Sequence, residues 1–231
     1  MKRTLLAFAV LAALVPSLAL AEAGDIVVRL RATYISPDES SSLGKTTDAN
    51  IAAGTAQPLY GSANAELRVE SNTIPELDLS YFITKNISAE LILALGTRHD
   101  VKVTPGQAGI AKNLGSVNLL PPTLTAQWHF NPDQTFDPYV GAGISYVHAM
   151  DNGLQAENGL PIRVSRNSFG PAIQAGFDYN LENKWLINLD VKKIWFDTKV
   201  ETSLNNGVTW TKIDQLKVDP WVVSLGFGRK F

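Results

Sequence analysis

The chain has 231 residues, no cysteine and a formal net charge of −2, and 45% of its residues are hydrophobic. The lack of cysteine excludes a disulfide framework, a thiolate metal site and a cysteine nucleophile. The slight acidic excess argues against a nucleic-acid-binding protein, which needs a basic face. A chain of this length suits a single domain.

The first 21 residues predict a signal peptide. Lys2 and Arg3 form a basic start, residues 5–15 form an apolar run, and a small-x-small cleavage motif ends at Ala21. The apolar run is too short to be retained as a membrane-spanning helix. We expect cleavage after Ala21, with Ala23 as the alternative site, so that a single domain starts at residue 22.

Apolar and polar residues then alternate along about eight segments, which predicts β-strands with one apolar face. Residues 65–81 are expected to form one long strand, bent or bulged at Pro75 because proline cannot donate to a ladder. Long polar stretches rich in Gly, Ser and Asn alternate with short turns between the segments. The strands are expected at residues 25–35, 65–81, 89–96, 116–130, 140–146, 169–179, 185–195 and 217–231, and the long loops at 36–63, 104–115, 149–167 and 199–213.

The last segment, residues 217–231, carries the most informative pattern. From Trp221 to Phe231 one face is apolar except for Arg229, while Ser224, Gly226, Gly228 and Lys230 on the other face are small or polar. Such a bare terminal strand is an aggregation hazard in a soluble protein, whereas in an outer-membrane barrel its apolar face contacts lipid. The pattern resembles the C-terminal signature that the barrel assembly machinery recognises, apart from Arg229. The apolar face consists of Trp221, Val223, Leu225, Phe227 and Phe231.

These patterns predict an all-β fold, an eight-stranded antiparallel transmembrane β-barrel over residues 22–231, with short periplasmic turns and long external loops. The alternative is a soluble barrel of lipocalin type, whose apolar face would be its core. A closed barrel satisfies its own strand edges, so we expect a monomer surrounded by outer-membrane lipid and lipopolysaccharide in a Gram-negative bacterium. An aromatic girdle near the turns is expected from Tyr81, Phe82, Trp128, Phe130, Tyr139, Tyr179, Trp185 and Phe231.

Several ordered motifs resemble the OmpW family of small outer-membrane proteins. The matching stretches read GSVNLLPPTLTAQWHF (residues 115–130), PYVGAGISY (138–146), KVDPWV (217–222) and TKNISAE (84–90), together with Arg98-His99. They cover nearly every strand. The resemblance implies an eight-stranded barrel with an apolar passage for the diffusion of small hydrophobic compounds.

An interior enclosed by eight strands is only wide enough for side chains or one small ligand. Charged residues on the polar faces of the strands therefore predict a network of paired charges, since a lone charge in a narrow lumen is costly. The predicted network consists of Arg29, Arg31, Glu66, Arg68, Asp78, Glu90, Asp190 and Lys192.

A hydrophobic ligand would not cross such a network, so we expect it to enter at the external loops and leave sideways into the bilayer. Gap candidates are Pro75, Pro121 and Pro122, which lack backbone donors. The passage is expected to be lined by Leu59, Tyr60, Leu119, Leu120, Leu154 and Leu160. The alternative function is a structural or surface-binding barrel with a plugged lumen and no transport.

Catalysis and metal binding have weak support in the sequence. His99 beside Asp100 imitates part of a hydrolase site, but neighbouring strand residues point to opposite faces. The loop carboxylates are more simply read as solvated charges. We therefore expect a non-enzyme without catalytic residues, cofactor or metal site.

Overall fold

A computed structural model describes residues 22–45, 65–94, 97–104, 112–155 and 159–231. The expected signal peptide at residues 1–21 and the lining candidates Leu59 and Tyr60 lie outside these residues. No helix in the described part of the chain is long and apolar enough to cross a membrane.

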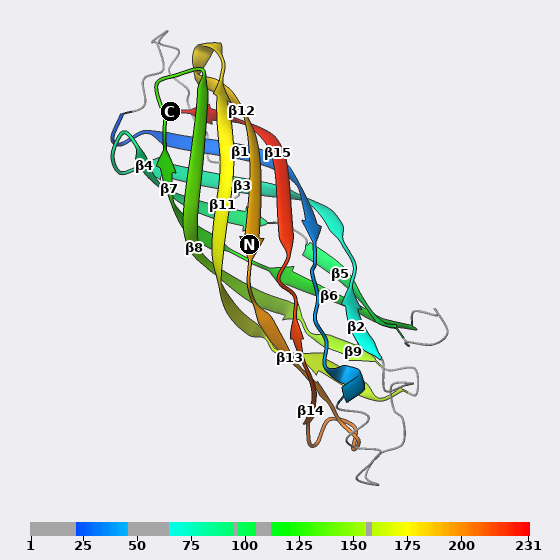
Figure 1. Ribbon diagram of the computed structural model, residues 1–231. Helices are drawn as coiled ribbons and strands as arrows, with labels where there is room; N and C mark the ends of the chain where they lie inside the picture. Colours follow the sequence, from blue (N-terminus) through cyan, green and yellow to red (C-terminus); the bar gives the residue numbers. More distant parts are fainter. Residues whose placement is uncertain (1–21, 46–64, 95–96, 105–111, 156–158) are drawn as a thin grey trace, which may run out of the picture.

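Eight antiparallel strands close into a barrel (Figure 1). Each strand pairs with the next one around the ring, and the last strand returns to the first, with Arg29 opposite Gly228. This closure confirms the expected fold and leaves the barrel without a free strand edge. The barrel strands are β1 (Ile26–Ser36), β3 (Asn72–Phe82), β4 (Ile87–Ala94), β7 (Thr123–His129), β8 (Phe136–Asp151), β11 (Asn167–Asn180), β12 (Trp185–Ile194) and β15 (Trp221–Lys230).

The connections confirm the expected alternation of long and short. Short turns, one of them containing the 3₁₀ turn η1 (Glu182–Lys184), gather at one end of the barrel, called here the turn end (Figure 1). The long connections gather at the opposite, loop end. Further strands extend the wall at the loop end: β2 (Glu66–Val69), β5 (Thr97–Thr104), β6 (Lys112–Leu120), β9 (Gly153–Gln155), β10 (Pro161–Val164), β13 (Asp197–Thr202) and β14 (Thr211–Lys217). Of these, β9, β10 and parts of β13 and β14 fall in stretches expected to be loops.

The single long strand expected over residues 65–81 is wrong. β2 pairs with β5 in the loop-end extension, whereas β3 pairs with β1 and β4 in the barrel. The division falls at Glu70, whose backbone N–H donates to the carbonyl of Asp100 at 2.9 Å. Pro75 stays inside β3, paired with Ala32 on β1.

The two faces of the barrel differ in polarity. Outward side chains are apolar and exposed, such as Ile144 at 62% and Phe169 at 68%, while Arg29 and Asp78 inside are fully buried. The apolar face of β15 also points outward, with its five expected residues 41–60% exposed. A soluble barrel would show the reverse distribution, so the outer face is suited to lipid.

The aromatic girdle needs two corrections. Phe82 and Tyr139 point into the barrel and are 2% and 1% exposed. Phe82 packs with Val27 and Leu186, because it follows the outward Tyr81 and side chains alternate along a strand. The exposed girdle at the turn end is formed by Tyr81, Trp128, Phe130, Tyr179, Trp185 and Phe231, joined by Phe136.

Candidate functional site

A group of ion pairs fills the middle of the barrel, and we call it the charged plug. Arg29 donates to both carboxylate oxygens of Asp178, at 3.2 Å from Nε and 2.5 Å from Nη2, and its Nη1 lies 3.2 Å from Glu90 Oε1. Two parallel bonds from one guanidinium to one carboxylate give a strong and geometrically specific pair. The plug consists of Arg29, Arg31, Glu76, Asp78, Glu90, Asp178, Asp190 and Lys192, all at most 3% exposed.

Arg31 connects the strands across the plug. Its Nη2 lies 3.1 Å from Glu90 Oε1, and its Nη1 lies 3.0 Å from Asp78 Oδ2. Beside it, Asp190 accepts bonds from Tyr139 Oη at 2.8 Å and from Lys192 Nζ at 2.9 Å. Charges taken out of water are tolerable when they are paired and hydrogen-bonded, as Asp190 is. Asp78 is paired with Arg31, but within the described residues its carboxylate accepts no hydrogen bond.

Six of the eight charges predicted for the network meet in the plug. Glu66 and Arg68 do not: they pair with each other at 2.6 Å on β2, with both side chains 49% exposed. The prediction fails because β2 belongs to the loop-end extension, where an outward face meets water. Sequence reasoning missed Glu76 and Asp178, which alternation alone places on the inward faces of β3 and β11.

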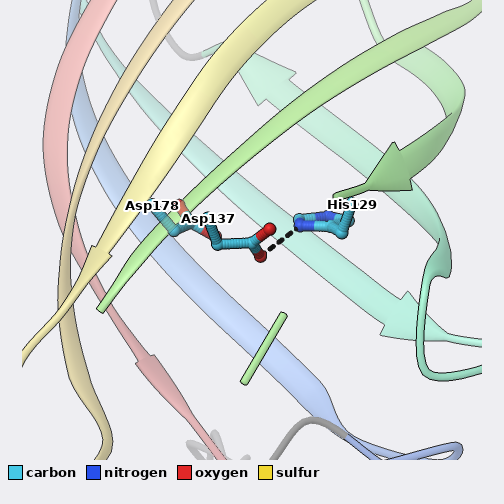
Figure 2. Close-up of side chains that lie close together, drawn as sticks. All are labelled: His129, Asp137 and Asp178. Atoms are coloured by element: carbon cyan, nitrogen blue, oxygen red, sulfur yellow. Dashed lines mark hydrogen bonds and ion pairs between the residues drawn. The ribbon is translucent and has the colours of Figure 1, made fainter. Parts of the chain in front are cut away.

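Below the plug, toward the turn end, His129 faces Asp137 and Asp178 (Figure 2). Their potential ligand atoms lie within 4.8 Å of one another. However, His129 Nδ1 already bonds Asp137 Oδ2 at 2.7 Å, and Arg29 occupies both oxygens of Asp178. A divalent cation would have to displace Arg29, so the geometry fits a hydrogen-bonded plug better than a metal centre.

The same histidine forms part of a Ser-His-Asp arrangement. Ser88 Oγ lies 3.4 Å from His129 Nε2, on the side of the ring opposite Asp137. Yet Ser88 Oγ donates to Gln127 Oε1 at 2.8 Å, and both Ser88 and His129 are fully buried. A serine nucleophile must donate to its base and reach a substrate carbonyl. His99 and Asp100, the other pair that resembles part of a hydrolase site, cannot act together, because His99 points inward and Asp100 points outward.

Above the plug, toward the loop end, two cavities form what we call the apolar chamber. The lower cavity encloses about 660 Å³ and the upper one about 580 Å³, counting their open ends. The lower cavity reaches the plug at Glu76 and Lys192. The two cavities are neighbours, because the same five residues line both: Val69, Leu119, Val147, Phe196 and Val218.

Only some of the residues predicted to line the passage contact a cavity. Leu119 lines both cavities and Leu154 lines the upper one, while Leu160 packs against the surrounding apolar cluster. Leu120 lines neither cavity, because it follows the inward Leu119 and therefore faces the other side of β6.

Beside the lower cavity the described strand pairing of the wall is interrupted, and residues 95–96, which fall within this interruption, lie outside the described residues. Pairing of β4 with β7 ends at Ile92 opposite Thr123, and pairing of β5 with β6 begins at Thr97 opposite Leu119. Pro121 and Pro122 lie within this wall interruption, and neither has a backbone N–H to donate. The chamber touches the interruption from both sides, through Ile92, Ala94 and Thr97 on one and Leu119, Pro121 and Thr123 on the other.

Pro75 lies on the opposite side of the same strand end. Pairing of β3 with β4 stops at Glu76 opposite Ala94, the position next to Pro75. The three prolines predicted at a gap therefore flank the end of β4. Only Pro121 lines the chamber, whereas Pro75 is exposed on the outer face.

An apolar outer band, a closed antiparallel ring and a polar interior define a membrane-spanning β-barrel of the outer-membrane type. A model of the OmpW family matches residues 22–231. Outer membrane protein W of Vibrio cholerae is 33% identical over 236 residues, which cover 100% of both chains. The chain therefore belongs to the OmpW family, and it is a Gram-negative outer-membrane protein whose turn end faces the periplasm.

Two further similarities place the fold. Outer membrane protein AlkL of Ectopseudomonas oleovorans is 30% identical over 163 residues, 71% of this chain and 68% of that protein. The crystal structure of the outer membrane protein OprG from Pseudomonas aeruginosa has a TM-score of 0.74 at 31% identity, and the match covers 91% of this chain and 97% of that one.

Proposed function

We propose that this protein is a channel for the passive uptake of small hydrophobic compounds, which enter at the external loops and leave through the wall interruption into the bilayer. The observation that carries the proposal is the position of the apolar chamber. Its lower cavity ends on the charged plug. It also touches both sides of the wall interruption, where Pro121 and Pro122 have no backbone N–H to donate to a neighbouring strand.

A straight path to the periplasm is unfavourable for an apolar molecule. It would have to part the ion pairs of Arg29 and Arg31, whose side chains are fully buried. Separating such pairs without replacing their hydrogen bonds costs several kcal/mol each. Lipid beside the interruption offers an apolar molecule a lower free energy than the plug does.

Proline also occurs at a second place in the wall, where backbone hydrogen bonds join the neighbouring strands. Near Pro220, between β12 and β15, the Ile194 N–H donates to the Pro220 carbonyl at 3.2 Å, and the Val218 N–H donates to the Phe196 carbonyl at 3.0 Å. Backbone bonds therefore continue across this junction. Proline alone therefore does not open the wall. We place the sideways route at the β4–β7 site because the lower cavity touches both sides of the interruption there.

A cross-link across the interruption tests the route. Continuing the register of Ile92 and Thr123 places Ala94 opposite Pro121, and the chain has no native cysteine to interfere. We expect oxidised Ala94→Cys/Pro121→Cys protein to lose uptake of 1-methoxynaphthalene into lipopolysaccharide-containing proteoliposomes, and a reductant to restore it. The control is Val191→Cys/Val223→Cys, which bridges strands already paired. Full uptake by the oxidised Ala94–Pro121 variant would exclude the lateral route.

The plug is also the observation that favours the alternative, a structural or surface-binding barrel without transport. That alternative predicts that the unmodified protein takes up the probe no faster than protein-free liposomes. The same experiment therefore separates the two functions before any variant is made.

A further inference from the structure

His99 on β5 presents an unused hydrogen-bond acceptor to the apolar chamber. The imidazole is only 4% exposed, and its Nδ1 lies 2.9 Å from the backbone carbonyl of Glu70. Because a carbonyl oxygen can only accept, Nδ1 carries the hydrogen, and Nε2 of the neutral ring is an acceptor. No residue in the described part of the chain donates to Nε2.

The other polar side chains of the lower cavity are already engaged. The Thr97 hydroxyl donates to the Leu119 carbonyl, and the Thr123 hydroxyl lies 2.9 Å from that of Ser145. Glu76 and Lys192 belong to the charged plug, through Arg31 and Asp190. His99 is the next inward residue after Thr97 on β5, toward the loop end, and it lines the lower cavity.

The imidazole is neutral where it lies. β5 runs beyond the apolar outer band, since its outward side chains are Arg98, Asp100 and Lys102. Burial lowers the pKa of His99 below the ordinary value for histidine. A neutral ring places no charge in the path of a hydrophobic compound, but it offers an acceptor at the cavity wall for a ligand that carries a donor.

We infer that His99 is a specificity-determining residue of the channel, whose Nε2 accepts a hydrogen bond from the hydroxyl of a small apolar alcohol or phenol. The inference rests on the proposed uptake function and names the substrate class within it. A ligand with a hydroxyl group donates a hydrogen bond to Nε2. A hydrocarbon or an ether of the same shape has no such donor and leaves Nε2 without a partner. A site of this kind distinguishes ligands by whether they make the hydrogen bond more strongly than by their size.

Binding of a matched pair of probes to the protein in nanodiscs at pH 8 tests this role. 1-Naphthol and 1-methoxynaphthalene share one apolar body, but only the naphthol can donate. We expect the unmodified protein to prefer the naphthol by about tenfold, as one neutral hydrogen bond of about 1.4 kcal/mol would give. The preference is measured against partition of each probe into protein-free nanodiscs.

Two substitutions separate recognition from folding. In His99→Asn the amide nitrogen takes the place of Nδ1 and keeps the bond to Glu70, while nothing replaces Nε2. In His99→Gln the amide oxygen takes the place of Nε2. We expect His99→Asn to bind both probes equally and His99→Gln to retain the preference for naphthol.

Each outcome decides between the two proposals. If the unmodified protein binds both probes equally, or if His99→Asn keeps the preference, His99 is not the determinant and the channel proposal stands. If the unmodified protein binds neither probe above the lipid background, the uptake function fails, and the role of His99 fails with it.

Discussion

The charged plug and the apolar chamber are built on the same strands by the same alternation, yet their chemistry is opposite. Along β1 the inward residues run from Arg29 and Arg31 through Thr33 to Ile35. Along β12 they run from Asp190 and Lys192 to Ile194. Backbone ladders, not lumen contacts, hold the strands together at both levels apart from the wall interruption, so the lumen can be ionic at one height and apolar at another.

The difference separates two tasks. The plug ties strands together across the lumen, whereas the chamber has an apolar lining and touches the stretch of wall that contains Pro121 and Pro122. Substitutions that act on one region should therefore leave the other largely unaffected. The following predictions test that separation.

Filling the chamber should have the largest effect. Val147 lines both cavities from β8, so Val147→Trp places a large ring where the two cavities meet. We expect uptake of 1-methoxynaphthalene to fall to the level of protein-free liposomes, at a stability cost of about 1–3 kcal/mol for overpacking. Ile144→Trp, on the lipid-facing side of the same strand, is the control and should transport normally. Normal uptake by Val147→Trp would show that the compound does not pass through the chamber.

Breaking the plug should reduce stability and leave uptake by the folded protein intact. Arg31→Met leaves the buried carboxylate of Asp78 without its ion-pair partner and leaves Glu90 with Arg29 alone, which should cost about 3–5 kcal/mol in the free energy of unfolding. Urea unfolding in lipid vesicles measures the loss. The control is Arg68→Met, at an exposed ion pair worth about 0–1 kcal/mol. Equal stabilities for the two variants would refute the structural role of the plug.

Zinc should have the smallest effect, because Arg29 already occupies both oxygens of Asp178 beside His129. We expect the urea midpoint to be the same with and without the ion. A bound metal at about 100 times its dissociation constant would add about 2.7 kcal/mol. A zinc-dependent rise that disappears in Asp137→Asn would instead establish a metal site at the turn end.

The sequence by itself determined most of the eight barrel strands, their inward and outward faces, and the membrane-facing closing strand. These follow from a period of two, which is a local property of an extended chain. Alternation therefore placed Arg29, Arg31 and Asp78 inside and Leu225 outside, and it could have placed Asp178. It also could have assigned Phe82 and Tyr139 to the interior, because each alternates with an outward neighbour.

Only the tertiary structure decided which inward residues meet and at what height. The chain changes partners at Glu70, so Glu66 and Arg68 lie on the rim, although their pattern matches that of the barrel strands. Register between strands distant in sequence brings Arg29 to Asp178 and sets Ile92 across from Thr123 beside the interruption. Pairing partner and register are properties of two strands together, and no periodicity within one strand contains them.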